Sequence, residues 1–265
     1  MSEEFTGIKL GVPTAEYREA DGINISALKE MGTSAKHYLD AITATPEPST
    51  DAQKIGTATH AAVLENDHST YVIRPHGLKF TTAAGKEWRD AQTKPILDRE
   101  EAENLHGMVT AIKNHPMANR ILFGPGGNNE VCCWKTHETT GLLLKGRADR
   151  VTEDSQNKIV VVDLKTCQRG DALQWRFARE ILKWKYDEQA SFYQQLFGAS
   201  FFCFVCVEKE KPYGVACYHL DADDLNEAYA TNEKHLAKVK ECSTSGIWPC
   251  YSDDLQTIKL KRRRE

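Results

Sequence analysis

The chain has 265 residues, which fits one large domain or a domain with an added helical lobe. Hydrophobic residues make up 40% and charged residues 27% of it, as in ordinary soluble proteins, and no apolar run approaches the roughly 20 residues that span a bilayer. The net charge of −4 at pH 7 does not indicate a nucleic-acid-binding protein, but it does not exclude one, because local basic stripes can coexist with a negative total.

The eight cysteines do not form a metal-binding pattern. Cys203 and Cys206 have the CxxC spacing of many zinc sites, but they lie in an apolar run, residues 201–207, where they are expected to pack as small hydrophobic side chains. No second CxxC pair completes a zinc site, and Cys132 and Cys133 are adjacent. The acidic N-terminus lacks the pattern of a signal peptide. We therefore expect reduced thiols and a cytoplasmic location.

The first half of the chain is predicted to be mainly helical. Residues 1–22 are expected to form an irregular lead-in. Ser26 is predicted to cap a helix that runs through Met31, although Lys29 stands where a capping box would need Glu or Gln. Ser34 is predicted to start a second short helix.

After a loop over residues 43–50, a helix is predicted over about residues 53–65. Small residues surround His60 in this helix and would let it approach another element closely. A single histidine on such a face is usually a packed or exposed residue, so by itself it does not indicate a ligand. Residues 84–122 continue the helical pattern, with apolar residues at helical spacing, namely Leu105, Met108, Val109 and Ile112.

A glycine-rich turn at residues 124–129 separates this helical lobe, residues 1–123, from a strand-rich core, residues 124–265. Short turns join the first predicted strands into an antiparallel meander, residues 130–134, 142–151 and 159–166. The later elements are predicted in the order helix 171–182, helix 187–198, strand 201–207, strand 214–220, helix 221–242 and a basic tail at 259–264. The predicted fold class is α/β: one domain over residues 1–265, with a mixed central β-sheet flanked by helices and an N-terminal helical lobe.

The most informative strand is residues 159–165, Ile-Val-Val-Val-Asp-Leu-Lys. Its β-branched residues are typical of a strand that is buried on both faces. Because side chains two apart in a strand point to the same side, Asp163 and Lys165 are predicted to project together. A carboxylate beside an ammonium can hold a divalent cation and position a water, but it also fits a salt bridge at the end of a strand. The triplet alone leaves both interpretations open.

Asp149 lies on the preceding predicted strand, and a turn around residues 153–157 joins the two strands. Asp149 and Asp163 can therefore both reach one end of the sheet. Two carboxylates about 4 Å apart repel each other by roughly 1–4 kcal/mol, so such a pair calls for a cation. Carboxylate oxygens favour Mg²⁺, for which Mn²⁺ can substitute. Gly146 allows another backbone or side chain to approach this strand closely.

Gln189 and Tyr193 are four apart on a predicted helix and share a face, which ordinary helix packing would also produce. Before them, basic residues alternate with aromatic residues, a pattern that suits phosphate contacts and base stacking. The same pattern suits a helix with an apolar face and a solvated basic face. If the first interpretation holds, the candidate nucleic-acid contacts are Arg176, Arg179, Lys183 and Trp184, together with Arg147.

Taken in order, the candidate residues resemble the active-site series of the PD-(D/E)xK nuclease superfamily, and within it the phage-type RecE exonucleases (exodeoxyribonuclease VIII). This series is His60, Glu130, Asp149, Asp163, Lys165, Gln189 and Tyr193. The resembling segments follow the family's order between about residues 23 and 193 and are 25–29, 35–38, 56–60, 64–65, 146–149, 162–166 and 186–193. The proline of the superfamily name is missing, because Ala148 precedes Asp149, but that position is loosely kept.

The resemblance implies a metal site with one or two Mg²⁺ ions. Asp149 and Asp163 would be ligands, the backbone carbonyl of Leu164 would be a further one, and His60 would complete the metal shell from the helical lobe. Glu130 is the least defined member of the series, either a ligand through water or an acid at the start of a strand.

The resemblance also implies roles for the other members. Lys165 would orient the attacking water or help to deprotonate it, and it would stabilise negative charge at the phosphate. The metal ions would activate that water and offset charge on the leaving oxygen. Gln189 and Tyr193 would shape the site and contact DNA or water.

The relatives that the chain resembles degrade the 5′-ended strand of linear duplex DNA and leave 3′ single-stranded tails for an annealing protein in recombination. They form ring-like oligomers. We therefore expect a Mg²⁺-dependent 5′–3′ exodeoxyribonuclease, a homo-oligomeric ring without membrane contact, in the cytoplasm of a bacterial or phage-infected cell. The alternatives are an endonuclease or single-strand exonuclease of the same superfamily, a non-catalytic DNA-binding accessory protein of recombination, and a metal-binding α/β protein unrelated to DNA.

Overall fold

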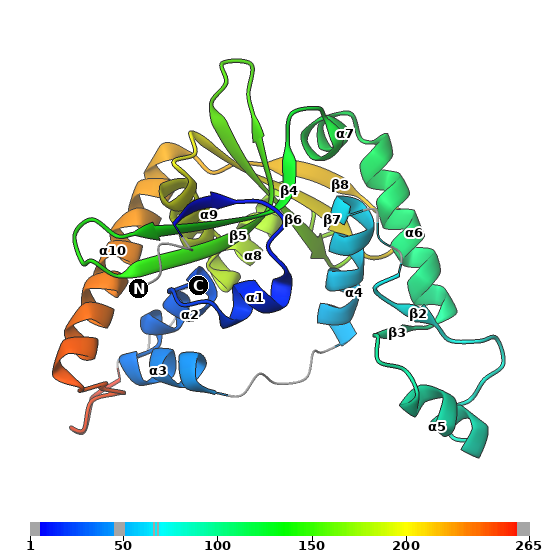
Figure 1. The fold of residues 1–265 in the computed structure, drawn as a ribbon, viewed down its shortest axis with the longest axis horizontal. Helices are drawn as coiled ribbons and strands as arrows, with labels where there is room; N and C mark the ends of the chain where they lie inside the picture. Colours follow the sequence, from blue (N-terminus) through cyan, green and yellow to red (C-terminus); the bar gives the residue numbers. More distant parts are fainter. Residues whose placement is uncertain (1–5, 45–50, 66, 68, 259–265) are drawn as a thin grey trace, which may run out of the picture.

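Figure 1 shows a computed structural model of the chain, which describes residues 6–44, 51–65, 67 and 69–258. A six-stranded mixed sheet in the order β1-β4-β5-β6-β7-β8 forms its centre. The strands of this sheet are β1 (Gly7–Lys9), β4 (Asn128–Thr136), β5 (Leu143–Glu153), β6 (Ile159–Cys167), β7 (Phe201–Glu208) and β8 (Val215–Tyr218). A separate parallel pair joins β2 (Val72–Ile73) to β3 (Ile96–Leu97). The predicted α/β class with a mixed central sheet is confirmed.

The strands β4, β5 and β6 form the predicted antiparallel meander, and β7 then pairs with β6 in parallel. A parallel pair needs a crossover connection, and here the crossover consists of α8 (Gln174–Trp184) and α9 (Tyr186–Phe197). The strand β8 returns antiparallel to β7. This crossover brings α9 onto the sheet, with contacts to β4, β5, β6 and β7.

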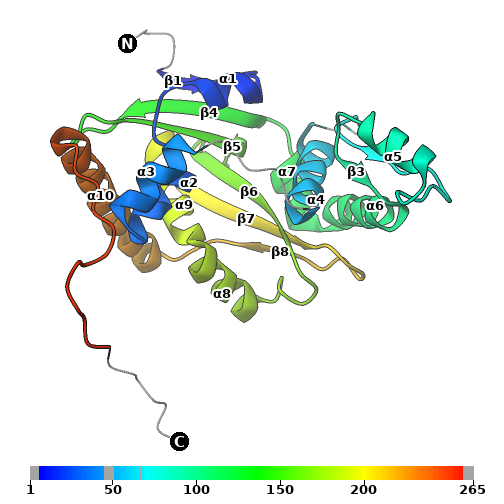
Figure 2. The ribbon, with the colours of Figure 1, turned by 90° about the horizontal axis from the view of Figure 1, so that it is seen from below.

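Alternating side chains of β7 supply both faces of the sheet, as strand geometry requires. Phe202, Phe204 and Cys206 belong to one core, and Val205 and Val207 belong to the other. The first core is closed by α2 (Ile25–Leu28), α3 (Ala35–Thr43), α8, α9 and α10 (Ala222–Ser245). The second core is closed by α4 (Asp51–His60), α6 (Arg99–Asn114) and α7 (Pro116–Phe123). In Figures 1 and 2, α4, α6 and α7 lie apart from α3, α9 and α10.

The prediction of an irregular lead-in over residues 1–22 is wrong for the part that the structure describes. The strand β1 extends the central sheet by pairing with β4, and α1 (Thr14–Glu19) follows it. The buried Lys145 of β5 donates hydrogen bonds to the carbonyls of Tyr17 and Arg18 in the last turn of this helix and to that of Ala20, which follows it. These contacts join distant segments, so the local pattern of the first 22 residues did not indicate them. The first 123 residues thus supply a strand of the main sheet as well as helices.

The predicted cap at Ser26 is also wrong. The side chain of Asn24 caps α2 by accepting the amide of Ala27 at 2.9 Å, and Ser26 lies inside the first turn. The predicted cap at Ser34 is confirmed, because its hydroxyl accepts the amide of His37 at the start of α3. Asparagine and serine are both short polar residues that satisfy free amides at a helix start, so sequence alone does not choose between neighbouring candidates.

The remaining helices lie close to their predicted positions. The helix predicted over 53–65 is α4 followed by a single π-helical turn, Ala61–Glu65. The helical pattern over 84–122 is divided into α5 (Ala83–Asp90), α6 and α7, and its four apolar positions on α6 are buried. All eight cysteines are free, and Cys203 and Cys206 are buried as predicted. Among the described residues, no helix combines the length and apolar character needed to cross a bilayer. The basic tail and residues 45–50 of the predicted loop lie outside the described residues.

Candidate active site

The site forms where β5 and β6 part. The pairing of β5 with β6 begins with Glu153 opposite Ile159 and ends with Arg150 opposite Val162. In contrast, β6 stays paired with β7 to its last residue. In the opening, the amide of Leu164 donates to the carboxylate of Asp149 (N···Oδ2 2.7 Å). A buried strand amide that has lost its ladder partner needs another acceptor, and Asp149 provides it.

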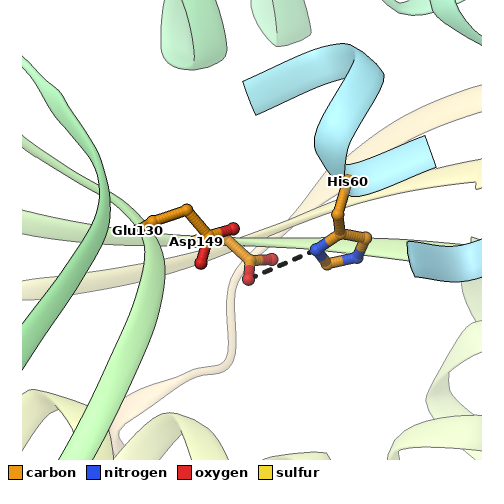
Figure 3. Close-up of side chains that lie close together, drawn as sticks. All are labelled: His60, Glu130 and Asp149. Carbon is orange, nitrogen blue, oxygen red and sulfur yellow. Dashed lines mark ion pairs between the residues drawn. The ribbon is translucent and has the colours of Figure 1, made fainter. Parts of the chain in front are cut away.

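Three potential metal ligands meet beside this opening (Figure 3). His60 ends α4, Glu130 lies on β4 and Asp149 lies on β5, and one ligand atom of each lies within 4.8 Å of the others. Within the described chain this is the one group of three such side chains that could hold a cation. The structure therefore brings together side chains from three elements, and His60 lies 70 or more residues before the other two in the sequence.

Glu130 is a full member of this group rather than a peripheral acid. In the β4–β5 register, Asn129 pairs with Arg150 and Val131 pairs with Ala148, so Glu130 stands opposite Asp149. Opposed like charges destabilise a strand pair, and Glu130 also has a left-handed backbone, with φ of 53°. The charge repulsion and the left-handed backbone both raise the free energy of the folded state at Glu130. This is the pattern expected where two carboxylates share a cation.

The electrostatics of the group show how strongly its charges interact. Burial alone would lower the pKa of His60, but the carboxylates of Asp149, 3.4 Å from Nδ1, and of Asp163 together outweigh burial and raise that pKa to about 9. Burial would raise the pKa of Asp149, but His60, Lys165 and the Leu164 amide lower it below its usual value. Burial and the nearby Asp149 raise the pKa of Glu130. Protonated His60 therefore balances part of the negative charge of the Glu130 and Asp149 carboxylates.

Asp163 and Lys165 form a second part of the site together with Gln189 of α9. The Lys165 ammonium lies 2.8 Å from Oδ2 of Asp163, and Gln189 donates to Oδ1 of Asp163 at 2.7 Å. Lys165 also donates to Oε1 of Gln189 at 3.2 Å and lies 4.4 Å from the centre of the Tyr186 ring. Asp163 and Lys165 project to the same side, as predicted, and the predicted Gln189 joins them.

Lys165 is held in its charged form. Burial would lower its pKa, but Asp163, Tyr186 and Asp149 together outweigh burial and raise the pKa above its usual value. A protonated ammonium can stabilise negative charge on a phosphate but cannot accept a proton from water. The raised pKa thus favours the electrostatic role expected for Lys165 over its role in deprotonating the water.

Tyr193 contacts the strand β5, which carries Asp149. Its hydroxyl donates to the backbone carbonyl of Arg147 at 3.0 Å, and its ring packs against β5 at Gly146. A Cβ atom at Gly146 would lie 2.8 Å from the Tyr193 ring and 2.6 Å from Leu196, so the close approach predicted for Gly146 is confirmed. Tyr193 therefore holds in place the strand that carries Asp149.

Arg147 is engaged within the protein. Its guanidinium pairs with the Glu130 carboxylate and donates to the hydroxyl of Thr14 on α1. Its predicted contact with DNA stays a prediction, but these contacts assign Arg147 a position beside the metal-ligand group. The other predicted DNA contacts are exposed on α8, outside that group: Arg176, Arg179, Lys183 and Trp184.

Sequence reasoning missed Lys29 as a neighbour of the site. Its ammonium donates to the carbonyl of Trp184 at the end of α8 and lies 5.5 Å from the centre of the Tyr186 ring. Burial and the nearby Lys165 lower the pKa of Lys29 to about 8. The segment 25–29 already belonged to the resembling pieces, so this motif was the signal that could have identified it.

The donor set fits a hard divalent cation. Two carboxylates and one imidazole are ligands that Mg²⁺ or Mn²⁺ accepts, and the opposed carboxylates supply the negative charge that such an ion would neutralise. Glu130 belongs to the group of potential metal ligands. The carboxylate of Asp163 is outside that group and contacts Lys165 and Gln189. Metal ligation by Asp163 and by the carbonyl of Leu164 stays a prediction.

Comparisons with known proteins agree with this geometry. The chain is similar to a crystal structure of a protein from Eubacterium rectale that is provisionally named an exonuclease, with a TM-score of 0.63, 12% identity, and coverage of 96% of this chain and 97% of that chain. At this identity the likeness shows a shared fold. The crystal structure of SSO0001 aligns with a TM-score of 0.32 and 14% identity over 69% of this chain and 86% of that chain, which is too weak to carry an argument. Comparison with curated proteins finds no match.

The family comparison covers most of the chain. The model described as "PDDEXK-like domain of unknown function (DUF3799)" matches residues 24–261, a stretch that contains every candidate site residue from His60 to Tyr193. The fold, the opening between β5 and β6 and this match agree, so the chain belongs to the family of PDDEXK-like domains of unknown function (DUF3799).

Proposed function

We propose that the protein is a metal-dependent nuclease that hydrolyses phosphodiester bonds of DNA. The observation that carries this proposal is the meeting of His60, Glu130 and Asp149 next to the pair formed by Asp163 and Lys165. A salt bridge at a strand end, the simpler interpretation of Asp163 and Lys165, does not account for two further acids and a histidine at the same opening.

The residues divide the chemistry between them. In hydrolysis, a water oxygen adds to phosphorus, one P–O ester bond breaks, and the departing oxygen takes up a proton. A divalent cation, when bound, supplies an acidified water and offsets charge at the phosphate. His60, Glu130 and Asp149 would hold that cation, and the charged Lys165 would stabilise the negative charge that grows on the phosphate. Gln189 keeps Lys165 and Asp163 aligned by contacting both.

The finer features of the proposal rest on the resemblance to RecE-type exonucleases. We infer Mg²⁺ as the cofactor, ends of linear duplex DNA as the substrate, and 5′–3′ degradation that leaves 3′ single-stranded tails. The same resemblance supports a cytoplasmic homo-oligomeric ring that works with a single-strand annealing protein in recombination.

A second candidate is a single-strand exonuclease of the same superfamily, and α8 favours it. Trp175 and Trp184 are about half exposed on this helix, at 51% and 52% of their surface. The guanidinium groups of Arg176 and Arg179 lie 5.1 and 4.8 Å from the Trp175 ring. Exposed aromatic rings flanked by cations suit the stacking of unpaired bases beside a charged backbone.

An assay with end-labelled DNA tests both candidates. Linear duplexes with a 5′-phosphate or a 5′-hydroxyl, single strands and covalently closed circles are incubated with Mg²⁺ or with EDTA. We expect mononucleotides from linear duplexes in Mg²⁺ alone. Cleavage of circles would indicate an endonuclease, and cleavage of single strands alone would support the second candidate. Full activity of Asp163→Asn, measured beside the exposed control Asp223→Asn, would show that the assigned site is wrong.

A further inference from the structure

Residues 72–97 form a small basic lobe made of β2, α5 and β3. Between Val72 and Leu97 the sequence has five lysines and arginines and two acidic residues, a net charge of +3 in a chain whose total is −4. In Figures 1 and 2, α5 and β3 lie toward the end of the molecule opposite α10. This projecting part therefore carries a local excess of positive charge, although the chain as a whole is net negative.

A cleft of about 590 Å³ runs along the basic lobe and is lined by three of its five basic side chains. Arg74, Arg89 and Lys94 line it, and Lys54 of α4 lines it from outside the basic lobe. Arg74 also lines a neighbouring cleft of about 790 Å³. Cations from two parts of the chain thus face a common open space.

The Phe80 ring lines the cleft, and Trp88 stacks against this ring. Phe80 and Trp88 stack with ring centres 6.3 Å apart and planes 15° from parallel. The guanidinium groups of Arg74 and Arg89 lie 5.3 and 6.0 Å from the centre of the Phe80 ring. A guanidinium held against a ring keeps its outward N–H groups free to bind phosphate and loses less side-chain entropy on binding.

The acidic residues of the cleft do not cancel this charge. Asp98 and Glu101 form a capping box at the start of α6, in which each carboxylate accepts the backbone amide of the other residue. Arg74 lies 4.0 Å from Asp98, and Arg89 pairs with the exposed Asp90. Such exposed ion pairs contribute little free energy, so a polyanion can compete for these arginines.

The helix α4 connects the basic lobe to the candidate active site. Lys54 lines the cleft, and His60, six residues later, is the last residue of the same helix. Six helical residues span about 9 Å, a length over which a DNA duplex carries roughly five phosphate charges. A duplex held at His60 thus has phosphates within reach of Lys54 and the cleft.

We propose that the basic lobe binds the phosphate backbone of the duplex part of the substrate, away from the bond that is cleaved. This inference rests on the proposed nuclease function. It identifies duplex DNA as the ligand, because an open cleft lined by lysines and by arginines packed on the Phe80 ring matches a regular row of phosphates. Its contacts carry no base recognition, so binding is independent of sequence and weakens steeply with salt.

Charge reversal tests the proposal. Arg89→Glu with Lys94→Glu changes two exposed residues of the cleft, and Lys234→Glu with Lys240→Glu makes the same change in charge on exposed positions of α10. Binding of a 30-base-pair duplex is measured by fluorescence anisotropy in EDTA at several salt concentrations. Hydrolysis of the p-nitrophenyl ester of thymidine 5′-phosphate, which is too small to reach the lobe, is measured with Mn²⁺.

We expect the lobe variant to lose at least about tenfold in duplex affinity and to lower the salt slope by about two, since each phosphate contact contributes about 0.9. Hydrolysis of the small ester and the melting temperature should stay at wild-type values, and the α10 variant should bind duplex like the wild type. An unchanged affinity and salt slope in the lobe variant, with wild-type protein that binds and cleaves DNA, would overturn this inference alone. Wild-type protein that neither binds nor cleaves DNA would overturn the proposed function and this inference with it.

Discussion

The amide of Leu164 donates a hydrogen bond to the carboxylate of Asp149 across the point where β5 and β6 separate. This bond fixes a candidate metal ligand on one strand by means of the backbone of the next. Leu164 itself lies between Asp163 and Lys165, so both parts of the site are tied to one short segment of β6. A site built on strand ends in this way is held more rigidly than one built on loops.

Removing the Lys165 ammonium should abolish most of the nuclease activity. We expect Lys165→Ala to lower kcat by about 100-fold or more with a smaller change in KM, because a positive charge aimed at a developing phosphate charge acts mainly in the transition state. The matched control is Lys158→Ala, an exposed lysine in the turn before the same strand. Steady-state hydrolysis of end-labelled duplex measures both. Equal kcat in the two variants would contradict the role assigned to Lys165.

Glu130 should contribute directly to metal affinity. We expect Glu130→Gln to weaken Mn²⁺ binding by about tenfold or more, because the cation would lose one of its two negatively charged carboxylate ligands. Isothermal titration and the rise in melting temperature on adding Mn²⁺ report this directly, since a ligand that binds the folded state stabilises it. Glu153→Gln, at the exposed end of β5, should bind Mn²⁺ like the wild type. If both variants bound alike, Glu130 would not be a ligand.

Gly146 should be required for the packing of α9 on β5. A Cβ atom there would lie 2.8 Å from Tyr193 and 2.6 Å from Leu196, so we expect Gly146→Ala to lower the free energy of unfolding by about 1–3 kcal/mol. Gly56→Ala in α4 is the contrasting variant, because its nearest neighbour would be 3.8 Å away. Alanine favours a helix interior by up to about 1 kcal/mol over glycine, so this variant should be as stable as the wild type or more stable. Urea unfolding measures both, and a Gly146→Ala protein of wild-type stability would refute the close approach.

Glu188 should make folding stability depend on pH. Burial is the main cause that raises its pKa above the usual value, with Lys185 acting against it. A group whose pKa is raised in the folded state adds stability below its unfolded pKa of about 4.3, and this contribution is lost as pH rises through the folded pKa. We therefore expect Glu188→Gln to gain stability relative to wild type as pH rises from 4 toward neutrality. The comparison is urea unfolding at several pH values with the exposed Glu227→Gln as control, and parallel profiles for Glu188→Gln and wild type would disprove it.

Much of this architecture was predictable because it depends on local periodicity. Four β-branched residues before Asp163 indicated a buried strand, and the period of two placed Asp163 and Lys165 on one side. The apolar positions of α6 and the strand pattern of β7 likewise follow from the spacing of side chains along a single element. Gln189 was predicted to share a face with Tyr193, and it meets Asp163 and Lys165.

The tertiary structure decided which distant residues meet. Sequence did not show that Glu130 stands opposite Asp149, because this depends on the register of β4 against β5. It did not show that β1 joins the sheet, or that Lys29 reaches the edge of the site from the N-terminal helices. A sequence by itself determines how side chains alternate along a strand or a helix, since bond geometry repeats over a few residues. Which side chains share a site is decided by pairing and packing over the whole chain, and these have no local pattern.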